Sequence, residues 1–572
     1  MLKDDLLDPV DRLLDDPQLA VLPLKNLSGD PGQEYLADGI TEELIGRLSR
    51  LHDVRVISRT SVTRFKNTQF SAPEISKMLG ADALVEGSVI RDGNRIRVHA
   101  QLIRGASDEH VWSESYDREL RDLLTLESDV AQAVAERVEV TVSGAEHQQL
   151  AKVRSVSPEI YELYLKGRFA LSRSKKEADV LEAIRYFEEA KVRDATFAPA
   201  DVGLAIGHAL LGSILVGAAP PEGERARAIS AAQRALQLDP ELPEAYVVLA
   251  ELHQNQWHWS EAEAEYRRAL VLNPNDANAH AKLALWLLCQ RRTEEALNWV
   301  NRARELDPLA VSGDLVGWTL YITRRFSEAD ELRTASATKP DDIGVLWRLG
   351  FVLIADNQPG EAIPVLEKAL RITNRSPGVV GVLAKAYALS GQRFKAIAVV
   401  DELQRRRETH YVSAAAFVNA YLGLGEIDQV FLWLEHGFKE QSNLMQWLAV
   451  DPMFDPLRSD ARFVDLVRRV GLGLYCANRE LPIHCLPVVQ KHPSDLIFGN
   501  PTARRKQPTN VCVSNSQGPR DFSHSLRCPQ HRNTFLAAKP DQTPSSSGGR
   551  CLAEQSGGFL RPRAANFPVG RQ

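Results

Sequence analysis

The sequence has few cysteines, and they are unevenly placed. Of the six in 572 residues, five lie near the C-terminus, at Cys476, Cys485, Cys512, Cys528 and Cys551. The chain before residue 475 contains only Cys289, so disulfides cannot hold that part of the fold together. We therefore expect apolar cores to stabilise the fold, and a reducing compartment.

The sequence also lacks the short motifs that mark common active sites. It has no Gly-Lys pair, which excludes a Walker A phosphate loop. It has no His-Glu-x-x-His, Gly-x-Ser-x-Gly, His-Arg-Asp or Asp-Phe-Gly either. We predict a protein that is not an enzyme and has no catalytic residues, no metal ligands and no cofactor.

Residues 26–44, NLSGDPGQEYLADGITEEL, carry two glycines where a nucleotide-binding protein would place a phosphate loop. Asp30 fits the N-cap of a helix, Pro31 its first position, and Gln33 the place from which a capping-box side chain returns to the cap amide. Gly29 and Gly32 lack the third glycine of a dinucleotide fingerprint. The stretch predicts a turn and a cap.

Positive charge is concentrated in a C-terminal tail, although the whole chain has a net charge of −6. Residues 475–572 carry 13 Lys and Arg against 5 Asp and Glu, and they show no helical or strand periodicity. We expect a disordered basic tail, for which a frameshift or read-through in the gene is one explanation. Without aromatic interleaving it predicts no specific nucleic-acid binding. A structural zinc site needs two pairs of closely spaced ligands. The tail offers only one such pair among Cys512, His524, Cys528 and His531, so we do not expect it to bind zinc.

Two segments are candidates for a targeting signal or a membrane span. Residues 1–18 are acidic and interrupted by proline, which predicts a linker and not a signal peptide. Val202 to Ala219 is apolar over a length that just spans a bilayer. It contains His208 and four glycines and lacks flanking basic residues, so we predict a buried helix and no membrane span.

The middle of the chain repeats with a period of 33 or 34 residues. A Glu-Ala or Lys-Ala pair recurs, with its alanine at Ala262, Ala296, Ala329, Ala362 and Ala396. Within residues 244–274 two helical runs are broken near Trp259, and Asn273-Pro274 ends the second. Ala250, Ala262 and Ala269 fall where a larger side chain would separate two helices, while Tyr246, Leu249 and Tyr266 fill the space between them.

This pattern resembles the tetratricopeptide repeat, whose helix pairs stack into a right-handed superhelix. The resemblance implies an array of about seven or eight repeats over residues 157–441. Residues 442–474, which include LAVDPMFDPLRSDARFVDLVRRVGL, resemble the helical cap that closes such arrays. Stacked repeats leave a concave groove, which is a surface for a protein or peptide partner.

Four aromatic residues are candidates for this groove. If the family alignment holds, Trp318, Tyr321, Trp347 and Phe351 project from first helices into the concave face and could anchor a peptide. The alternative is that they pack between repeats, because aromatic residues at helical spacing are more often part of a core.

Ahead of the repeats, the sequence predicts an α/β domain over residues 19–145. Strand-like runs cover 19–24, 54–58, 83–91, 95–103 and 110–116, helical patterns cover 34–51, 73–79 and 125–140, and Asp92-Gly93 predicts a hairpin. These runs resemble the TolB amino-terminal-like domain found beside tetratricopeptide repeats in bacterial regulators. There it usually follows a winged-helix domain, a nucleotide cyclase or a Ser/Thr kinase.

The two resemblances together imply a non-catalytic interaction module of bacterial signal transduction. The alternative is a fragment of a larger regulator (adenylate cyclase, Ser/Thr kinase or winged-helix transcription factor) that lacks its effector domain. We expect a cytoplasmic protein, or a periplasmic one if it belongs to a membrane-anchored regulator.

Overall fold

The computed structural model describes residues 17–138, 143–152, 156–173, 176–213, 219–309, 311–328, 330–338 and 340–472. The expected N-terminal linker lies almost wholly outside these residues. So do the expected basic tail and its candidate zinc ligands Cys512, His524, Cys528 and His531.

An α/β region with a mixed sheet comes first, in the order β3-β1-β4-β5-β6, with β2 paired to β4. Strands β1, β3 and β4 are parallel to one another, whereas β4, β5 and β6 form an antiparallel meander. The predicted hairpin at Asp92-Gly93 is confirmed, and Gly93 has a φ of 56° there. The strands are β1 (Gln18–Val21), β2 (Lys25–Asn26), β3 (Arg55–Val56), β4 (Ala83–Asp92), β5 (Arg95–Arg104) and β6 (Glu109–Glu119).

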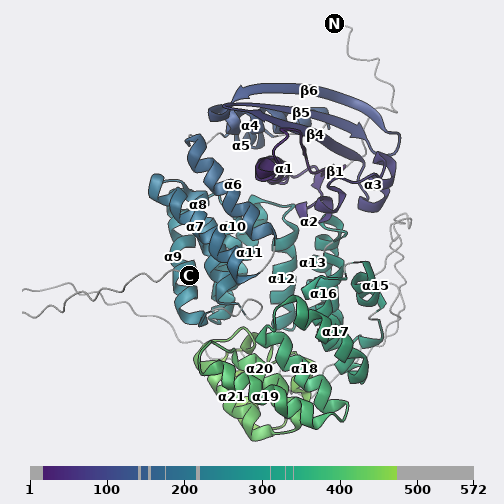
Figure 1. Ribbon diagram of the computed structural model, residues 1–572, viewed down its shortest axis with the longest axis vertical. Coiled ribbons are helices and arrows are strands. Elements are labelled where there is room, and N and C mark those ends of the chain that lie inside the picture. Colours follow the sequence, from purple (N-terminus) through teal and green to yellow (C-terminus); the bar gives the residue numbers. More distant parts are fainter. Residues whose placement is uncertain are drawn as a thin grey trace, which may run out of the picture. The chain divides into compact units, whose positions relative to one another are not determined.

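Helices α1 and α4 lie on one face of this sheet (Figure 1). The alternation in β5 explains this arrangement, since Ile96, Val98, Ala100 and Leu102 are fully buried while Arg95 and Arg97 are exposed. The helices of this region are α1 (Glu34–Leu48), α2 (Arg59–Val62), α3 (Ala72–Leu79), α4 (Leu123–Arg137) and α5 (Gly144–Leu150).

The turn and cap predicted before α1 are present, but the capping box is not. A 3-10 turn at Pro31–Gln33 leads into α1, and Asp30 Oδ1 accepts a hydrogen bond from the Gly32 amide at 2.8 Å. The Gln33 side chain donates to Asp30 Oδ2 at 3.4 Å instead of accepting from the cap amide. The prediction for Gln33 was wrong: its amide N–H is directed at the charged Asp30 carboxylate, and its Oε1 has no hydrogen-bond partner among the described residues.

The rest of the described chain is a succession of antiparallel helix pairs that form a solenoid (Figure 1). The earlier helices are α6 (Pro158–Arg173), α7 (Glu177–Arg193), α8 (Ala198–Leu211), α9 (Pro221–Leu238), α10 (Pro243–Asn255), α11 (Trp259–Leu272), α12 (Ala277–Cys289) and α13 (Thr293–Leu306). The later ones are α14 (Val311–Ile322), α15 (Asp330–Thr338), α16 (Ile343–Ala355), α17 (Pro359–Ile372), α18 (Pro377–Leu389), α19 (Arg393–Arg407), α20 (Ala414–Leu424), α21 (Ile427–Lys439) and α22 (Ala461–Arg469).

Small residues bring the two helices of a pair together, as the repeat pattern predicts. Ala250, Ala262 and Ala269 are completely buried where α10 meets α11, and Tyr266 fills the space beside them. The Tyr266 hydroxyl donates to Gln254 Oε1 at 2.9 Å, which satisfies its polar atom inside the core.

The apolar run that begins at Val202 belongs to this array. Helix α8 holds its first part, and residues 214–218 lie outside the described residues. No helix in the part of the chain that the structure describes is both long enough and apolar enough to cross a membrane.

In the six pairs from α10–α11 to α20–α21, the turn between the helices contains a residue in the left-handed conformation. The residue with positive φ lies five positions before the recurring alanine, or before Val430, which takes the place of that alanine in the last pair. In successive repeats this residue is Trp257, Arg291, Arg324, Asn357, Gly391 and Gly425. Left-handed backbone costs a non-glycine residue about 1–2 kcal/mol. Four repeats therefore use a side chain where glycine is the less strained choice.

At this left-handed position, a substitution to glycine and a substitution from glycine are expected to change the free energy of unfolding in opposite directions. Arg291→Gly should raise the free energy of unfolding by about 0.5 kcal/mol, since relief of backbone strain exceeds the entropy that glycine adds to the unfolded chain. Gly391→Ala should lower it by about 1 kcal/mol, because open space surrounds a Cβ there and only strain remains. Urea titrations of both variants beside the parent protein measure the difference, and equal shifts would contradict the strain argument.

Buried His280 in α12 is expected to make the array sensitive to acid. Its Nε2–H donates to the Pro274 carbonyl at 2.9 Å, and burial lowers the His280 pKa to about 4. The neutral ring thus stabilises the fold above pH 6.5, and that contribution is lost as the pH falls toward 4. Between pH 6.5 and 4, the free energy of unfolding should depend less steeply on pH in His280→Gln than in the parent, by on the order of 1 kcal/mol per pH unit. Melting curves recorded at several pH values measure this slope, and equal slopes for the two proteins would contradict the prediction.

Candidate functional site

One position in the first helix of each pair sets the inner surface of the array. The residue eleven positions before the recurring alanine (Val430 in the last pair) is Glu251, Leu285, Trp318, Phe351, Lys385 and Asn419 in successive repeats. All but Lys385 line one cavity of about 1350 Å³. Four positions earlier, one helical turn away, Val247, Ala281, Trp347 and Ala415 also line it. These two rows form the concave wall.

The structure brings the four predicted aromatic residues together. The Trp318 ring stacks on Tyr321 at 5.1 Å and meets Phe351 edge-on at 5.8 Å, and Trp347 meets Phe351 at 5.2 Å. Arg348 lies over both indoles, 4.5 Å from the Trp318 centroid and 5.1 Å from that of Trp347. Trp318, Tyr321 and Phe351 are buried, whereas Trp347 is half-buried. Trp347 is therefore the accessible member of the cluster.

A later segment of the chain contacts two of the buried members, Trp318 and Tyr321. We call residues 441–472 the closing segment. Trp447 meets the Trp318 ring edge-on at 5.1 Å, and the Tyr321 hydroxyl donates to Asp451 Oδ1 at 2.7 Å. Burial raises the Asp451 pKa despite this bond, and burial together with Asp451 holds the Tyr321 pKa well above its usual range.

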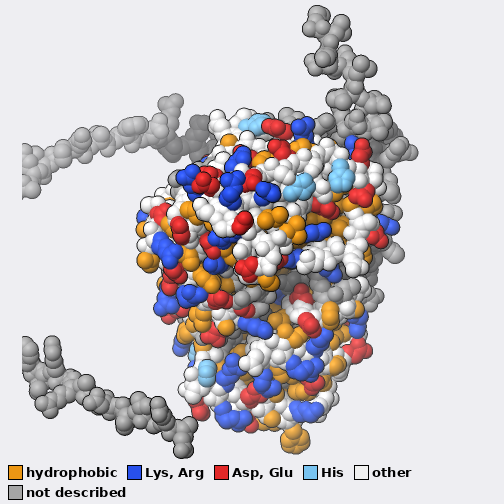
Figure 2. Space-filling view, turned by 45° about the horizontal axis from the view of Figure 1, so that its top comes forward, with side chains coloured by type: hydrophobic (Ala, Val, Ile, Leu, Met, Phe, Trp, Pro, Cys, Tyr) orange, Lys and Arg blue, Asp and Glu red, His pale blue; other side chains and the backbone are white. Residues whose placement is uncertain are grey.

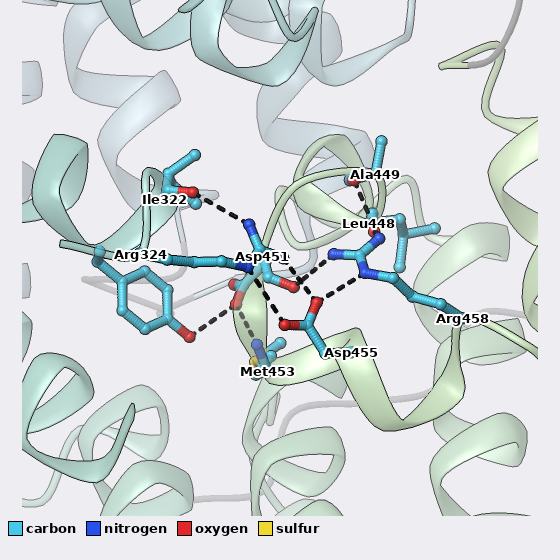
Figure 3. Close-up of polar contacts among 9 residues, drawn as sticks. Ile322, Arg324, Leu448, Ala449, Asp451, Met453, Asp455 and Arg458 are labelled. Carbon is cyan, nitrogen blue, oxygen red and sulfur yellow. Dashed lines mark hydrogen bonds and ion pairs between the residues drawn. The ribbon is translucent and has the colours of Figure 1, made fainter. Parts of the chain in front are cut away.

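Around Asp451 the closing segment is held by a dense polar network (Figure 3). Arg324, from the left-handed turn after α14, donates to Asp455 Oδ1 at 2.7 Å. Arg458 donates to the same carboxylate oxygen at 2.7 Å and to the Asp451 carbonyl at 3.0 Å. The Met453 amide donates to Asp451 Oδ1 at 2.8 Å. The bond from Arg324 to Asp455 explains why this turn contains arginine and not glycine, despite the strain of its left-handed backbone.

The same segment also reaches the early repeats. Arg225 in α9 donates to the Gln441 carbonyl at 2.8 Å, and Gln254 in α10 donates to Gln446 Oε1 at 2.6 Å. The Trp259 indole donates to the Val470 carbonyl at 3.1 Å. The closing segment therefore ties the start of the array to its end across the concave side.

Apolar burial makes this closure a fixed part of the fold. Eleven apolar side chains of the segment are at most 6% exposed, and six of the larger ones are Leu444, Met445, Leu448, Phe454, Phe463 and Leu466. Burial of one such side chain contributes about 1.5–3 kcal/mol, so their release costs on the order of 10 kcal/mol. A micromolar ligand supplies about 8 kcal/mol. Displacement of the segment by a partner is accordingly unfavourable.

The α/β region forms the opposite wall of the cavity. Asn275, in the turn before α12, donates through Nδ2 to the carbonyls of Ser49, Leu51 and Val54 at 2.9–3.1 Å. The Ser61 hydroxyl donates to Asp307 at 2.5 Å. The α/β core also continues into α6 through Tyr161 and Leu165 and into α8 through Ala200, across the predicted gap between residues 145 and 157.

Charge is locally balanced on the face of the described residues that Figure 2 displays. Acidic and basic side chains are interspersed over the face displayed in Figure 2. In the cavity wall Glu42 pairs with Arg59 at 3.1 Å and also with Arg168, and Glu251 pairs with Lys282. The two arginines keep the Glu42 pKa below its usual range although burial opposes this.

A family model described as Tetratricopeptide repeat matches residues 222–285 and 353–416. The chain contains tetratricopeptide repeats. The matched residues run from α9 into α12 and from α16 into α20, so the repeats are the elements that build the concave wall.

Several known proteins share part of this sequence. "Putative adenylate cyclase 3" of Rhizobium meliloti (strain 1021) is 34% identical over 251 residues, which are 42% of this chain and 41% of that protein. "Type IV pilus assembly protein PilF" of Pseudomonas aeruginosa is 29% identical over 143 residues, 24% of this chain and 57% of that protein. The chain thus spans about two fifths of the cyclase-named relative.

Solved structures show likeness over part of this chain. PilW, a type IV pilus biogenesis factor, covers 40% of this chain and 97% of its own at 18% identity and a TM-score of 0.30. YrrB, described as a TPR protein with an unusual peptide-binding site, covers 33% of this chain and 92% of its own at 20% identity and a TM-score of 0.22.

Sequence reasoning found the aromatic cluster but missed two features of the wall. It did not name Leu285 or Asn419, although a fixed offset from the recurring alanine identifies both. It named the cap but not its contacts with Tyr321 and Arg324, because no periodic signal joins residues about 130 positions apart.

Proposed function

We propose that this protein is a non-catalytic interaction module that binds a segment of a partner protein along the concave face of its tetratricopeptide repeats. The observation that carries the proposal is the half-buried Trp347 beside Arg348 at the wall of a 1350 Å³ cavity. That volume exceeds the 300–1,000 Å³ typical of small-molecule clefts. The TolB-like resemblance of the α/β region supports a place in bacterial signal transduction.

Trp347→Ala is expected to reduce partner capture while the protein stays folded. Loss of a central aromatic anchor costs about 2 kcal/mol of binding free energy, or more than tenfold in affinity. Partners captured by the full chain are identified by mass spectrometry and then titrated against the variant. Circular dichroism and melting curves monitor the fold.

Trp299→Ala is the matched control, since Trp299 is also half-buried but packs on His280 and does not line the cavity. Equal losses of binding in the two variants would contradict the proposal. A Trp347→Ala protein that unfolds would assign this residue to the core, and the proposal would then lose its anchor.

A second candidate is that the chain supplies the non-catalytic part of a larger nucleotide-cyclase regulator. The 34% identity to a protein named as a cyclase favours it, with well over half of that protein outside the match. We expect the purified chain to form no cyclic AMP from ATP in a chromatographic assay. Measured turnover would contradict the non-catalytic role.

A further inference from the structure

The concave side is divided between two occupants. The closing segment fills the part next to Tyr321 and Arg324, as described above. The open part runs along the beginnings of the first helices, where Asn278, Lys282, Trp347 and Arg348 line the cavity. Ser58, Thr60 and Arg50 of the α/β region line it from the other side. A partner in the open part would touch both regions.

Buried polar atoms in this wall match what a peptide main chain offers. The indole N–H of Trp347 has no hydrogen-bond partner among the described residues. Oδ1 of Asn275 and Oδ1 of Asn419 also lack one, and both residues are 4% exposed. All three residues line the cavity. One donor and two acceptors complement the carbonyl and amide groups of an extended segment.

Arg50 adds a charge preference to this wall. It is half-buried, and no ion pair or side-chain hydrogen bond joins it to the residues the structure describes. Most carboxylates of the cavity are engaged: Glu42 with Arg59, Glu43 with Arg47, Glu251 with Lys282, Asp307 with Ser61, Asp341 with Lys368 and Asp276 with backbone amides. An incoming carboxylate therefore finds a guanidinium that is not already neutralised by a partner.

We propose that the α/β region and the repeats form one composite site for an extended acidic protein segment, with Arg50 pairing its carboxylate. This inference rests on the proposed function and deepens it, because it names the chemistry of the partner and assigns the α/β region a direct role in binding. The closing segment stays in place while the partner binds.

A displayed library of random peptides tests this proposal on the full chain. The selected peptides are expected to be enriched in Asp and Glu. Arg50→Ala should weaken their binding about tenfold, the effect of losing a charged hydrogen bond. Arg50→Glu should shift the selection toward Lys and Arg. Arg64→Ala, an exposed arginine of the same region that does not line the cavity, is the matched control.

The outcomes separate the two proposals. Peptides that depend on Trp347 but bind Arg50→Ala and Arg50→Glu normally would overturn the composite site and leave the interaction role standing. Peptides that depend on neither residue, or a library that yields none, would overturn both. Arg50→Lys, which keeps the charge and should keep at least part of the binding, distinguishes a lost contact from a misfolded protein.

Discussion

Phe454→Ala is expected to lower the free energy of unfolding by about 3–5 kcal/mol. Phe454 lies in the closing segment, is completely buried, and packs its ring 5.4 Å from that of Phe463. Truncation removes this burial and leaves a cavity that the surrounding helices cannot fill without moving. Denaturant titration followed by circular dichroism measures the change.

Leu432→Ala in α21 is the control for this prediction. Leu432 is 61% exposed, so its truncation should change stability by less than about 0.5 kcal/mol. If Phe454→Ala behaved like the control, the closing segment would be loosely attached. The concave groove would then be open to partners along its whole length.

Asp451→Ala is expected to cost about 3–4 kcal/mol of stability. The substitution leaves the Tyr321 hydroxyl buried without an acceptor and removes the nearby charge that favours protonated Lys385. Burial already lowers the Lys385 pKa to about 8, so loss of Asp451 should lower it further.

A double-mutant cycle with Tyr321→Phe measures the coupling directly. The two substitutions should be less than additive by about 1 kcal/mol, since each removes the same hydrogen bond. Additive effects would show that the 2.7 Å contact between Tyr321 and Asp451 contributes nothing to the closure.

Most of the fold could be predicted because its signals are local. The recurring alanine and the Asn273-Pro274 stop place α10 and α11 within a few residues of their observed bounds, and Asp92-Gly93 places the hairpin. Each signal arises from contacts between residues that are near one another in sequence. Periodicity therefore captures these elements.

The candidate site was predictable only in part, because its contacts are not local. The repeat register brings Trp318, Tyr321, Trp347 and Phe351 together, but it does not show that the closing segment contacts Trp318 and Tyr321. Nor does it show that Asn275 joins the array to the α/β region, since that contact spans more than 220 residues. Three-dimensional packing decides which of the four aromatic side chains remains accessible.

Hydrogen exchange with and without a selected acidic peptide tests the central claim most directly, which is that the partner and the closing segment occupy different parts of the concave face. We predict that the peptide slows amide exchange around residues 343–348 of α16 and around Arg50. Amides of residues 444–470 should stay as protected as the most stable helices in both states. Faster exchange of residues 444–470 on peptide binding would show that the segment is displaced, and would contradict this account.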